Sequence, residues 1–291
     1  QGSGRLELAK RMLDPSNPVL PRVMVNRLWH YHFGEGIVRS TDDFGVQGQP
    51  PTHPELLDYL ASEFVRQGWS IKKMHRLMVR SSAYRMASRS DPKNEEVDPQ
   101  NKLLHRMPVR RLEAECIRDA ILSVSGRLDL NLYGPSVTPH LTPFMQGRGR
   151  PNASGPLDGD GRRSIYLAVR RNFLTPMFLD FDYPIPFTTI GRRSVSNVPA
   201  QALTLMNNPF VVGEAQRWAK RVLAEKDRTP AQRVETMYVT AFGRTPTEIE
   251  LKDALAFLDE QAKEYGKTGD PRVWADLCHV LLNVKEFIFL N

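Results

Sequence analysis

The sequence predicts a mainly α-helical protein with one small β element near its middle and long loops rich in glycine and proline. Three observations support this fold class. Apolar residues recur every three or four positions over most of the chain, as on one face of an amphipathic helix. Prolines and glycines stand at the starts and ends of these stretches. Among the 22 Pro and 19 Gly of the 291 residues, many fall in residues 134–163, which predicts a long irregular loop.

Five helices are expected before this loop, and most have a start or stop signal. They cover residues 5–13, 22–33, 53–67, a stretch that begins at Ser70, and 110–125. Pro15 ends the first helix. Gly34 and Gly126 end the second and the fifth in the manner of a glycine C-cap. Thr52 and Glu55 give the capping-box pattern at the start of the third.

The second half of the chain begins with two expected strands. Residues 164–170 and 177–183 are rich in β-branched and aromatic side chains, and we expect them to pair as a hairpin. Helices follow over residues 199–207, 209–225, 230–242, 247–265 and 272–289. The last three helices carry more acidic than basic residues. We therefore expect a main helical domain over residues 1–228, with the β insertion around 164–183, and a C-terminal three-helix subdomain over 229–291.

The composition excludes several classes of protein. With 41% hydrophobic and 25% charged residues the chain can bury a full core, and no apolar stretch approaches the ~20 residues of a membrane span. Two cysteines exclude a disulfide-dense scaffold, and there is no Cys-x-x-Cys pair for zinc or covalent haem. We therefore expect no cofactor in this chain. Cys116 and Cys278 fall on apolar helix faces, which predicts buried thiols, with a single bridge between them as the alternative.

Positive charge is concentrated in one part of the sequence. The formal net charge is +7, and residues 66–89 contain seven basic residues and no acidic one. On the helix that begins at Ser70, helical spacing places basic residues opposite the apolar ones. The basic residues of this face are Lys72, Lys73, Arg76 and Arg80. Such a face favours an anionic partner, and the alternative is a solvated surface that acids elsewhere in the fold balance.

Two carboxylates stand two residues apart in the second expected strand. Alternate residues of a strand share a face, so Asp180 and Asp182 would point the same way, about 6.5–7 Å apart. Two carboxylates at that range can serve glycoside hydrolysis or hold a cation. The alternative is that they form the polar face of a half-buried strand.

Arginine doublets recur at residues 110–111, 162–163, 170–171 and 192–193. The planar guanidinium suits carboxylate, sulfate or phosphate, which makes Arg170, Arg192 and Arg193 candidate anion-binding residues. Internal ion pairing is the alternative. It would join Arg111 to Glu115, and Arg170 to one of the two aspartates across the hairpin.

No common catalytic motif is present. The sequence lacks G-x-S-x-G, H-E-x-x-H, a P-loop and a G-x-G-x-x-G before a helix, so nucleophilic, zinc-peptidase and nucleotide-binding sites have no motif support. Asp42, Asp43 and His53 lie in or beside the first glycine-rich loop and are the candidate metal ligands. Packing or capping roles are the alternative for these residues, and we expect no metal site.

Several segments in one order resemble a known family. They include NRLWHYHFGEGIVRSTDDFG, PTHPELLDYLASEF, GWSIKKMHRLMVRSSAYR, LHRMPVRRLEAECIRDAILSVSGRLD and PAQALTLMNNPFV. Together they resemble the planctomycete secreted domain PSD1, domain of unknown function 1553, from about residue 5 to 291. The resemblance implies the C-terminal part of a large exported protein, often with a cytochrome-c-like module ahead of it, at a periplasmic or cell-surface location. It implies no activity and no catalytic residues.

The beginning of the chain fits such an origin. Its first residue is Gln1 rather than Met, and no charged-then-apolar leader follows. We therefore expect a piece cut from a longer protein.

These observations favour a non-catalytic binding or scaffolding module. Its expected partner is an anionic polysaccharide or the preceding domains of the same full-length protein. The alternative is a carbohydrate hydrolase that uses Asp180 and Asp182, with Arg170 or Arg192 holding an acidic sugar. Nucleic acid is a weaker candidate, because the basic helix has few interleaved aromatic residues and no known binding motif.

Overall fold

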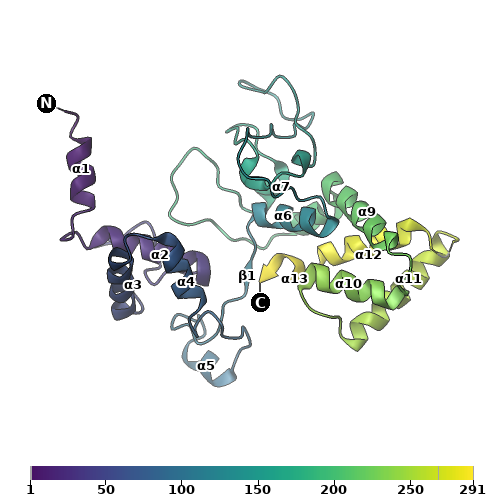
Figure 1. Cartoon of the computed structure of the whole chain (residues 1–291), viewed down its shortest axis with the longest axis horizontal. Coiled ribbons are helices and arrows are strands. Elements are labelled where there is room, and N and C mark those ends of the chain that lie inside the picture. The colour runs from purple at the N-terminus through teal and green to yellow at the C-terminus, as the bar shows by residue number, and fades with distance from the viewer. Residues whose placement is uncertain (1, 268, 291) are drawn as a thin grey trace. The chain divides into compact units, whose positions relative to one another are not determined.

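The computed structural model describes residues 2–267 and 269–290, and within them the chain is mainly helical (Figure 1). These residues form 13 α-helices, two short 3-10 helices and one two-stranded antiparallel sheet. The predicted fold class is confirmed. None of the described helices is both long enough and apolar enough to span a lipid bilayer.

The chain divides into two compact units. The N-terminal unit contains the described residues up to Arg110 together with Ile190–Arg192, and the C-terminal unit contains Arg111–Thr189 and Arg193–Leu290. The predicted main domain over residues 1–228 therefore spans both units. The last three predicted helices lie in the same unit as the helices before them, and their standing as a separate subdomain stays a prediction.

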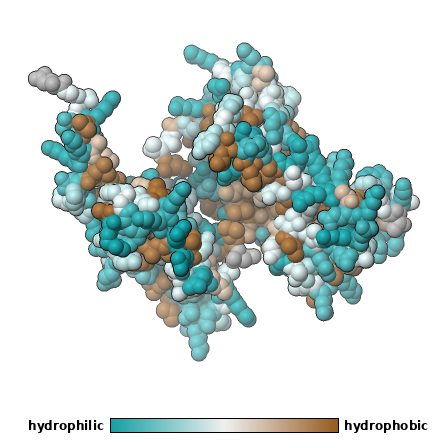
Figure 2. Space-filling model, viewed as in Figure 1, coloured by the Kyte–Doolittle hydropathy of each residue, from teal (hydrophilic) through white to brown (hydrophobic). Residues whose placement is uncertain are grey.

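Five helices belong to the N-terminal unit. They are α1 (Arg5–Met12), α2 (Val19–Phe33), α3 (Pro54–Arg66), α4 (Ile71–Val79) and α5 (Pro92–Val97). Helix α2 packs against α3 and α4, and Val25, Phe64 and Met74 are buried in the core they share. Helix α1 adds nothing to this core, because none of its residues is buried and apolar side chains lie exposed along it (Figure 2).

A buried asparagine fixes the loop that follows α2. The Asn26 side chain donates to Val38 O at 2.9 Å and accepts from Val38 N at 2.8 Å. Gly36 fits beside this pair because a Cβ at that position would lie only 2.4 Å from Val38 O. The Thr52 N–H then donates to Ile37 O at 2.9 Å, so the far end of the loop is tied to its beginning.

Replacing Asn26 with alanine is expected to destabilise the N-terminal unit by about 2–3 kcal/mol, because the buried N–H and C=O of Val38 lose their partners. Urea titration followed by hydrogen exchange of α2 measures the change. Asn94→Ala is the control, because Asn94 is exposed on α5 and its side chain makes no hydrogen bond to any residue that the structure describes. Equal stability of the two variants would contradict the role given to Asn26.

The helix starts differ in how well the sequence predicts them. Ser70 caps α4 as expected, accepting from Lys73 N at 3.4 Å. The capping box predicted for α3 is absent, because His53 occupies the N-cap position and makes no side-chain cap bond. The Thr52 hydroxyl instead hydrogen-bonds His53 Nδ1 at 2.9 Å. Pro54 in the first turn supplies the start, since its fixed φ suits that position.

Helices α9 (Pro209–Ala224) and α12 (Pro271–Asn283) pack against each other at the centre of the C-terminal unit. The other helices of this unit are α6 (Ala114–Ser125), η1 (Gly159–Gly161), η2 (Ser164–Tyr166), α7 (Pro176–Asp180), α8 (Pro199–Asn207), α10 (Pro230–Phe242), α11 (Glu248–Glu264) and α13 (Lys285–Ile288). Helix α9 also packs against α6. Ile121, Trp218 and Leu282 are buried in the resulting core.

The hairpin predicted over residues 164–183 is wrong. Its first part forms η2 and its second part forms α7, and the described chain has only isolated bridges in this region. Pro176 begins α7, where its missing N–H has no intrahelical partner to lose. Met177 and Phe178 then enter the core. The β-branched and aromatic residues of this segment therefore mark buried positions, and such positions occur in short core helices as well as in strands.

The sheet forms elsewhere, from two short strands that are far apart in the sequence. These are β1 (Arg110–Arg111) and β2 (Phe289–Leu290). Leu112 N continues the pairing by donating to Ile288 O at 2.7 Å. The helix predicted over 110–125 accordingly begins only at Ala114, and the helix predicted over 272–289 is divided into α12, which ends at Asn283, and α13, which ends at Ile288.

The two cysteines lie in different environments. Cys116 is exposed on α6, and Cys278 is fully buried on α12. Both thiols are free, so the bridge is not formed and the expectation that Cys116 is buried is wrong. Burial raises the pKa of the Cys278 thiol.

Candidate functional site

The basic face of α4 is exposed as the sequence predicts. Met74 and Met78 point into the core of the N-terminal unit, and the opposite face is solvated. The exposed basic residues of that face are Lys72, Lys73, Arg76 and Arg80. Within the described chain none of these four side chains forms an ion pair. We call them the α4 basic face.

The two candidate catalytic aspartates do not share the face of a strand. Asp180 is the last residue of α7, and its carboxylate accepts from the Thr204 hydroxyl. Asp182 lies beyond the helix with φ 61°, a left-handed conformation. Its carboxylate accepts from Arg111 at 2.7 Å and from Ser196 N at 2.8 Å. The strand geometry on which their pairing rested is therefore wrong.

The charge state of Asp182 follows from these contacts. Burial opposes ionisation, but the Ser196 hydrogen bonds and the Arg111 guanidinium outweigh it and lower the pKa of Asp182. A glycosidase acid needs the opposite shift, a carboxyl whose pKa is raised so that it keeps its proton. At neutral pH Asp182 is ionised, and its hydrogen bonds to Arg111 and Ser196 hold the chain after α7 in place.

The arginine doublets have divergent roles. Arg111 pairs with Asp182 rather than with Glu115. Arg193 pairs with Glu115 at 2.7 Å and with Glu113 at 3.2 Å, so the internal ion pairing considered for the doublets is formed there. Arg170 is exposed in the C-terminal unit, and neither Asp180 nor Asp182 pairs with it.

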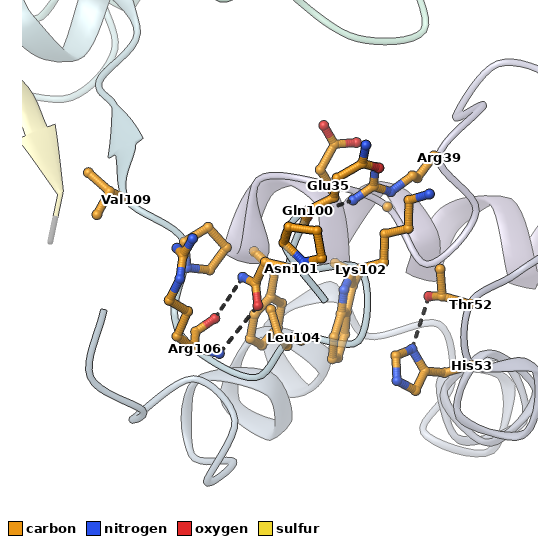
Figure 3. Close-up of a pocket in the computed structure, with 15 residues that line it drawn as sticks. Glu35, Arg39, Thr52, His53, Gln100, Asn101, Lys102, Leu104, Arg106 and Val109 are labelled. Carbon is orange, nitrogen blue, oxygen red and sulfur yellow. Dashed lines mark hydrogen bonds between the residues drawn. The ribbon is translucent and has the colours of Figure 1, made fainter. Parts of the chain in front are cut away.

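A polar cavity opens in the N-terminal unit beside the end of α2 (Figure 3). Its volume is about 260 Å³, and a second section of about 450 Å³ shares part of its lining. We call the two sections together the basin, whose size is typical of small-molecule sites. Trp29, stacked on Phe33, lines the first section, and Asp42 and Arg192 line the second. The residues common to both are Glu35, Arg39, Gln100 and Lys102.

Two well-anchored loops present these side chains. The two hydrogen bonds between Asn26 and Val38 hold the loop after α2, and this loop carries Glu35 and Arg39. On the other side, the buried Asp98 carboxylate accepts from the N–H groups of Lys102 and Leu103 at 2.9 and 2.7 Å. Asn101, with φ 48°, donates to Arg106 O at 2.9 Å across the same turn. The turn is therefore closed by its own side chains before any ligand binds.

Two cations of the basin form no salt bridge within the described residues, although Arg39 is close enough to Asp98 to help lower the pKa of that carboxyl. Arg39 donates to Gln100 O at 3.4 Å, a weak bond to a backbone carbonyl. Lys102 uses only its backbone N–H in the turn, and its side chain extends towards Arg39 (Figure 3). A guanidinium and an ammonium that line one cavity and form no salt bridge contribute positive charge to it.

Two further cations of the basin, Arg106 and Arg192, are paired. Arg106 is held by Glu95 at 2.7 Å. Arg192 contacts Glu35 at 3.2 Å, but both side chains are about half exposed, at 54% and 46%, so this pair is weak. Nearby His30 adds no charge at neutral pH, because burial lowers its pKa.

The candidate metal ligands are not gathered into a site. Asp42 and His53 line different sections of the basin. The Asp43 carboxylate accepts from Gly45 N at 2.8 Å and shapes a turn. In the part of the chain that the structure describes, no three His, Cys, Asp or Glu side chains are arranged to hold a metal ion.

Comparison with known families identifies the chain. The family model PSD1, described as a protein of unknown function (DUF1553), matches residues 4–258. This chain belongs to the PSD1 family. The resemblance of the ordered segments is thereby confirmed as far as residue 258, and its extension to residue 291 lies outside the match. No curated protein and no solved structure matches this PSD1 chain at a significant level. The matched residues include both the α4 basic face and the basin, to which the family description assigns no role.

A histidine pair in this PSD1 chain joins α2 to α4. His32 Nε2 and His75 Nδ1 are 2.8 Å apart and share a hydrogen bond. Burial, the neighbouring His75 and Arg110 lower the pKa of His32 below its ordinary 6.5. The unfolded chain therefore takes up a proton that the folded unit resists. Stability of the N-terminal unit is expected to fall as the pH drops below about 6.5 and to level off below the folded pKa.

Urea titrations at pH 7, 6 and 5, followed by hydrogen exchange of α2 and α4, measure this pH dependence. His32→Gln is expected to reduce the dependence between pH 7 and 5, while His30, whose pKa burial also lowers, supplies the remainder. His140→Gln, in the C-terminal unit, is the matched control and leaves it unchanged. An undiminished pH dependence in His32→Gln would contradict the assignment.

Proposed function

We propose that this PSD1 chain is a non-catalytic module that binds an anionic polysaccharide through its N-terminal unit, as part of an exported multidomain protein in the periplasm or at the cell surface. The observation that carries the proposal is the α4 basic face, four exposed cations on one helix face without ion pairs. A polyanion fits such a row because it supplies repeated charges along one line.

The surroundings of α4 support the same partner. Arg85 and Arg89, which follow the helix, are also exposed, so positive charge continues beyond its end. The nearest acid in sequence, Glu63, is held by Arg66 at 2.6 Å. The basin adds Arg39 and Lys102 to the same unit. A polysaccharide with one acidic group per repeat would meet several of these cations at once.

Retention of the whole chain on immobilised polygalacturonate tests the proposal. Wild type is expected to bind at 50 mM salt and to elute as salt rises, because salt screens exposed charges. A variant with glutamine at all four positions of the α4 basic face is expected to bind about 10- to 30-fold more weakly, since each exposed ion pair contributes little but four are lost together.

A charge-matched variant serves as the control. Lys220, Lys226, Lys252 and Lys263 are exposed lysines of the C-terminal unit. Their replacement by glutamine lowers the net charge by the same amount and is expected to leave retention within twofold. Equal losses in both variants would show adsorption by net charge alone and overturn the proposal. Failure of wild type to bind at low salt would overturn it in favour of a neighbouring domain as the partner.

A further inference from the structure

We propose that the basin is a subsite for one acidic sugar unit, a uronate, at which the carboxylate binds between Arg39 and Lys102. The inference rests on the proposed function and gives it a chemical class. The α4 basic face would attract a polyanion of any kind, whereas the basin would select what that polyanion is made of. Three properties of the lining support this assignment.

The first property is the positive charge of Arg39 and Lys102. Arg39 and Lys102 form no ion pair within the described residues, and Arg39 has only a 3.4 Å bond to Gln100 O to give up. A guanidinium fork binds a carboxylate with two parallel hydrogen bonds, and the ammonium adds a third donor. Because the Asp98 turn fixes the backbone of Lys102, little main-chain order remains to be lost when an anion binds.

The second property is the set of hydrogen-bond acceptors beside those cations. Glu35 and Asp42 contribute carboxylates to the second section, and Gln49 and Gln100 contribute amides. A phosphate or a polyphosphate has few or no protons to donate and would leave these acceptors without donors. A ligand that carries hydroxyl groups next to its acid satisfies both kinds of group. Sugar acids have this combination.

The third property is an apolar wall. Trp29 lines the first section, and its ring lies 3.9 Å from that of Phe33, which holds it in one orientation. Small-molecule sites typically combine such a surface with a few directed polar groups. A pyranose ring has an apolar face of C–H groups that can rest on the indole while its edge hydroxyls and carboxylate face the polar residues.

Calorimetric titration of the whole chain with trigalacturonate and with its methyl ester tests the inference. The acid is expected to bind at least tenfold more tightly than the ester, which keeps every ring hydroxyl but loses the charge. Arg39→Met and Lys102→Met are each expected to weaken binding of the acid about tenfold. Arg27→Met is the matched control, an exposed arginine of α2 outside the basin, and keeps the wild-type affinity.

The remaining outcomes separate this inference from the proposed function. If polygalacturonate retention depends on the α4 basic face while Arg39→Met leaves trigalacturonate binding unchanged, the subsite is wrong and the proposed function stands. Equal binding of acid and ester overturns the role of the cations. Inorganic sulfate that competes as strongly as trigalacturonate overturns the role of the hydroxyl acceptors. If neither polymer nor trimer binds, both proposals fail.

Discussion

Replacing Arg118 with methionine is expected to lower the free energy of unfolding of the C-terminal unit by about 3–5 kcal/mol. The Arg118 side chain is only 4% exposed. It donates to Asp158 O at 2.6 Å, to Arg162 O at 2.9 Å and to Ser164 Oγ at 3.0 Å, and so ties the loop around η1 to α6. Methionine fills most of the same space, so the loss comes from buried acceptors without donors rather than from a cavity.

Urea titration with hydrogen exchange of α6 measures the effect of Arg118→Met. Arg163→Met is the matched control. Arg163 contacts the same acid, Asp119, at 3.9 Å, but its side chain is 40% exposed, so its loss is expected to cost less than about 0.5 kcal/mol. Similar values for the two variants would show that burial of Arg118 does not set its contribution.

Arg111→Met is expected to destabilise the same unit by a similar amount, about 3–5 kcal/mol. The Arg111 side chain is 3% exposed and donates to Ser196 O at 2.9 Å, to Phe181 O at 3.2 Å and to Asp182. The variant leaves the Asp182 carboxylate partly buried without its cation. Because the pKa of Asp182 is lowered from its ordinary 3.8, its ionised form stabilises the fold above about pH 4. That contribution is lost as the pH falls through the folded pKa.

A double-mutant cycle with Asp182→Asn measures the coupling between the two residues. The double variant is expected to be less destabilised than the sum of the single variants, since the asparagine leaves no buried charge. Arg170→Met, at an exposed arginine of the same unit, is the control and changes stability little. Additive losses would contradict a direct Arg111–Asp182 interaction.

Most helices could be predicted because their signals are local. Pro199, Pro209 and Pro230 each stand in the first turn of the helix expected there. The capping pattern at Thr247 closes with Glu250 as a complete capping box. The α4 basic face follows from helical periodicity alone, because apolar and basic residues alternate with the period of a helix.

The β element could not be placed from the sequence. Two-residue strands such as Arg110–Arg111 carry no periodicity, and their pairing with residues 289–290 depends on the whole C-terminal unit being folded. The stretch with strand composition, residues 177–183, forms a short helix because Pro176 sets its first turn and the core accepts its side chains. Tertiary packing decided between two structures that share the same apolar residues.

The basin could not be predicted for a related reason. Its charged lining comes from Arg39, Lys102 and Arg192, which are spread over more than 150 residues and follow no motif. Only Asp42, His53 and Arg192 were candidates on sequence grounds, each for a separate reason. Asn26 and Asp98 anchor the basin's two loops, but the burial of these side chains becomes visible only in the folded structure.

Because Cys116 is exposed and Cys278 is buried, the two thiols can be used to follow unfolding of the C-terminal unit. A maleimide reagent should label Cys116 in the native protein and reach Cys278 only after α12 leaves the core. Partial desolvation, together with nearby acids, raises the pKa of Cys116 as well, so its labelling becomes faster as the pH rises. Pulse alkylation followed by mass spectrometry would then give the fraction of molecules whose C-terminal unit has opened. It would do so without added probes, while a fluorophore on Cys116 marks the same molecules for binding assays.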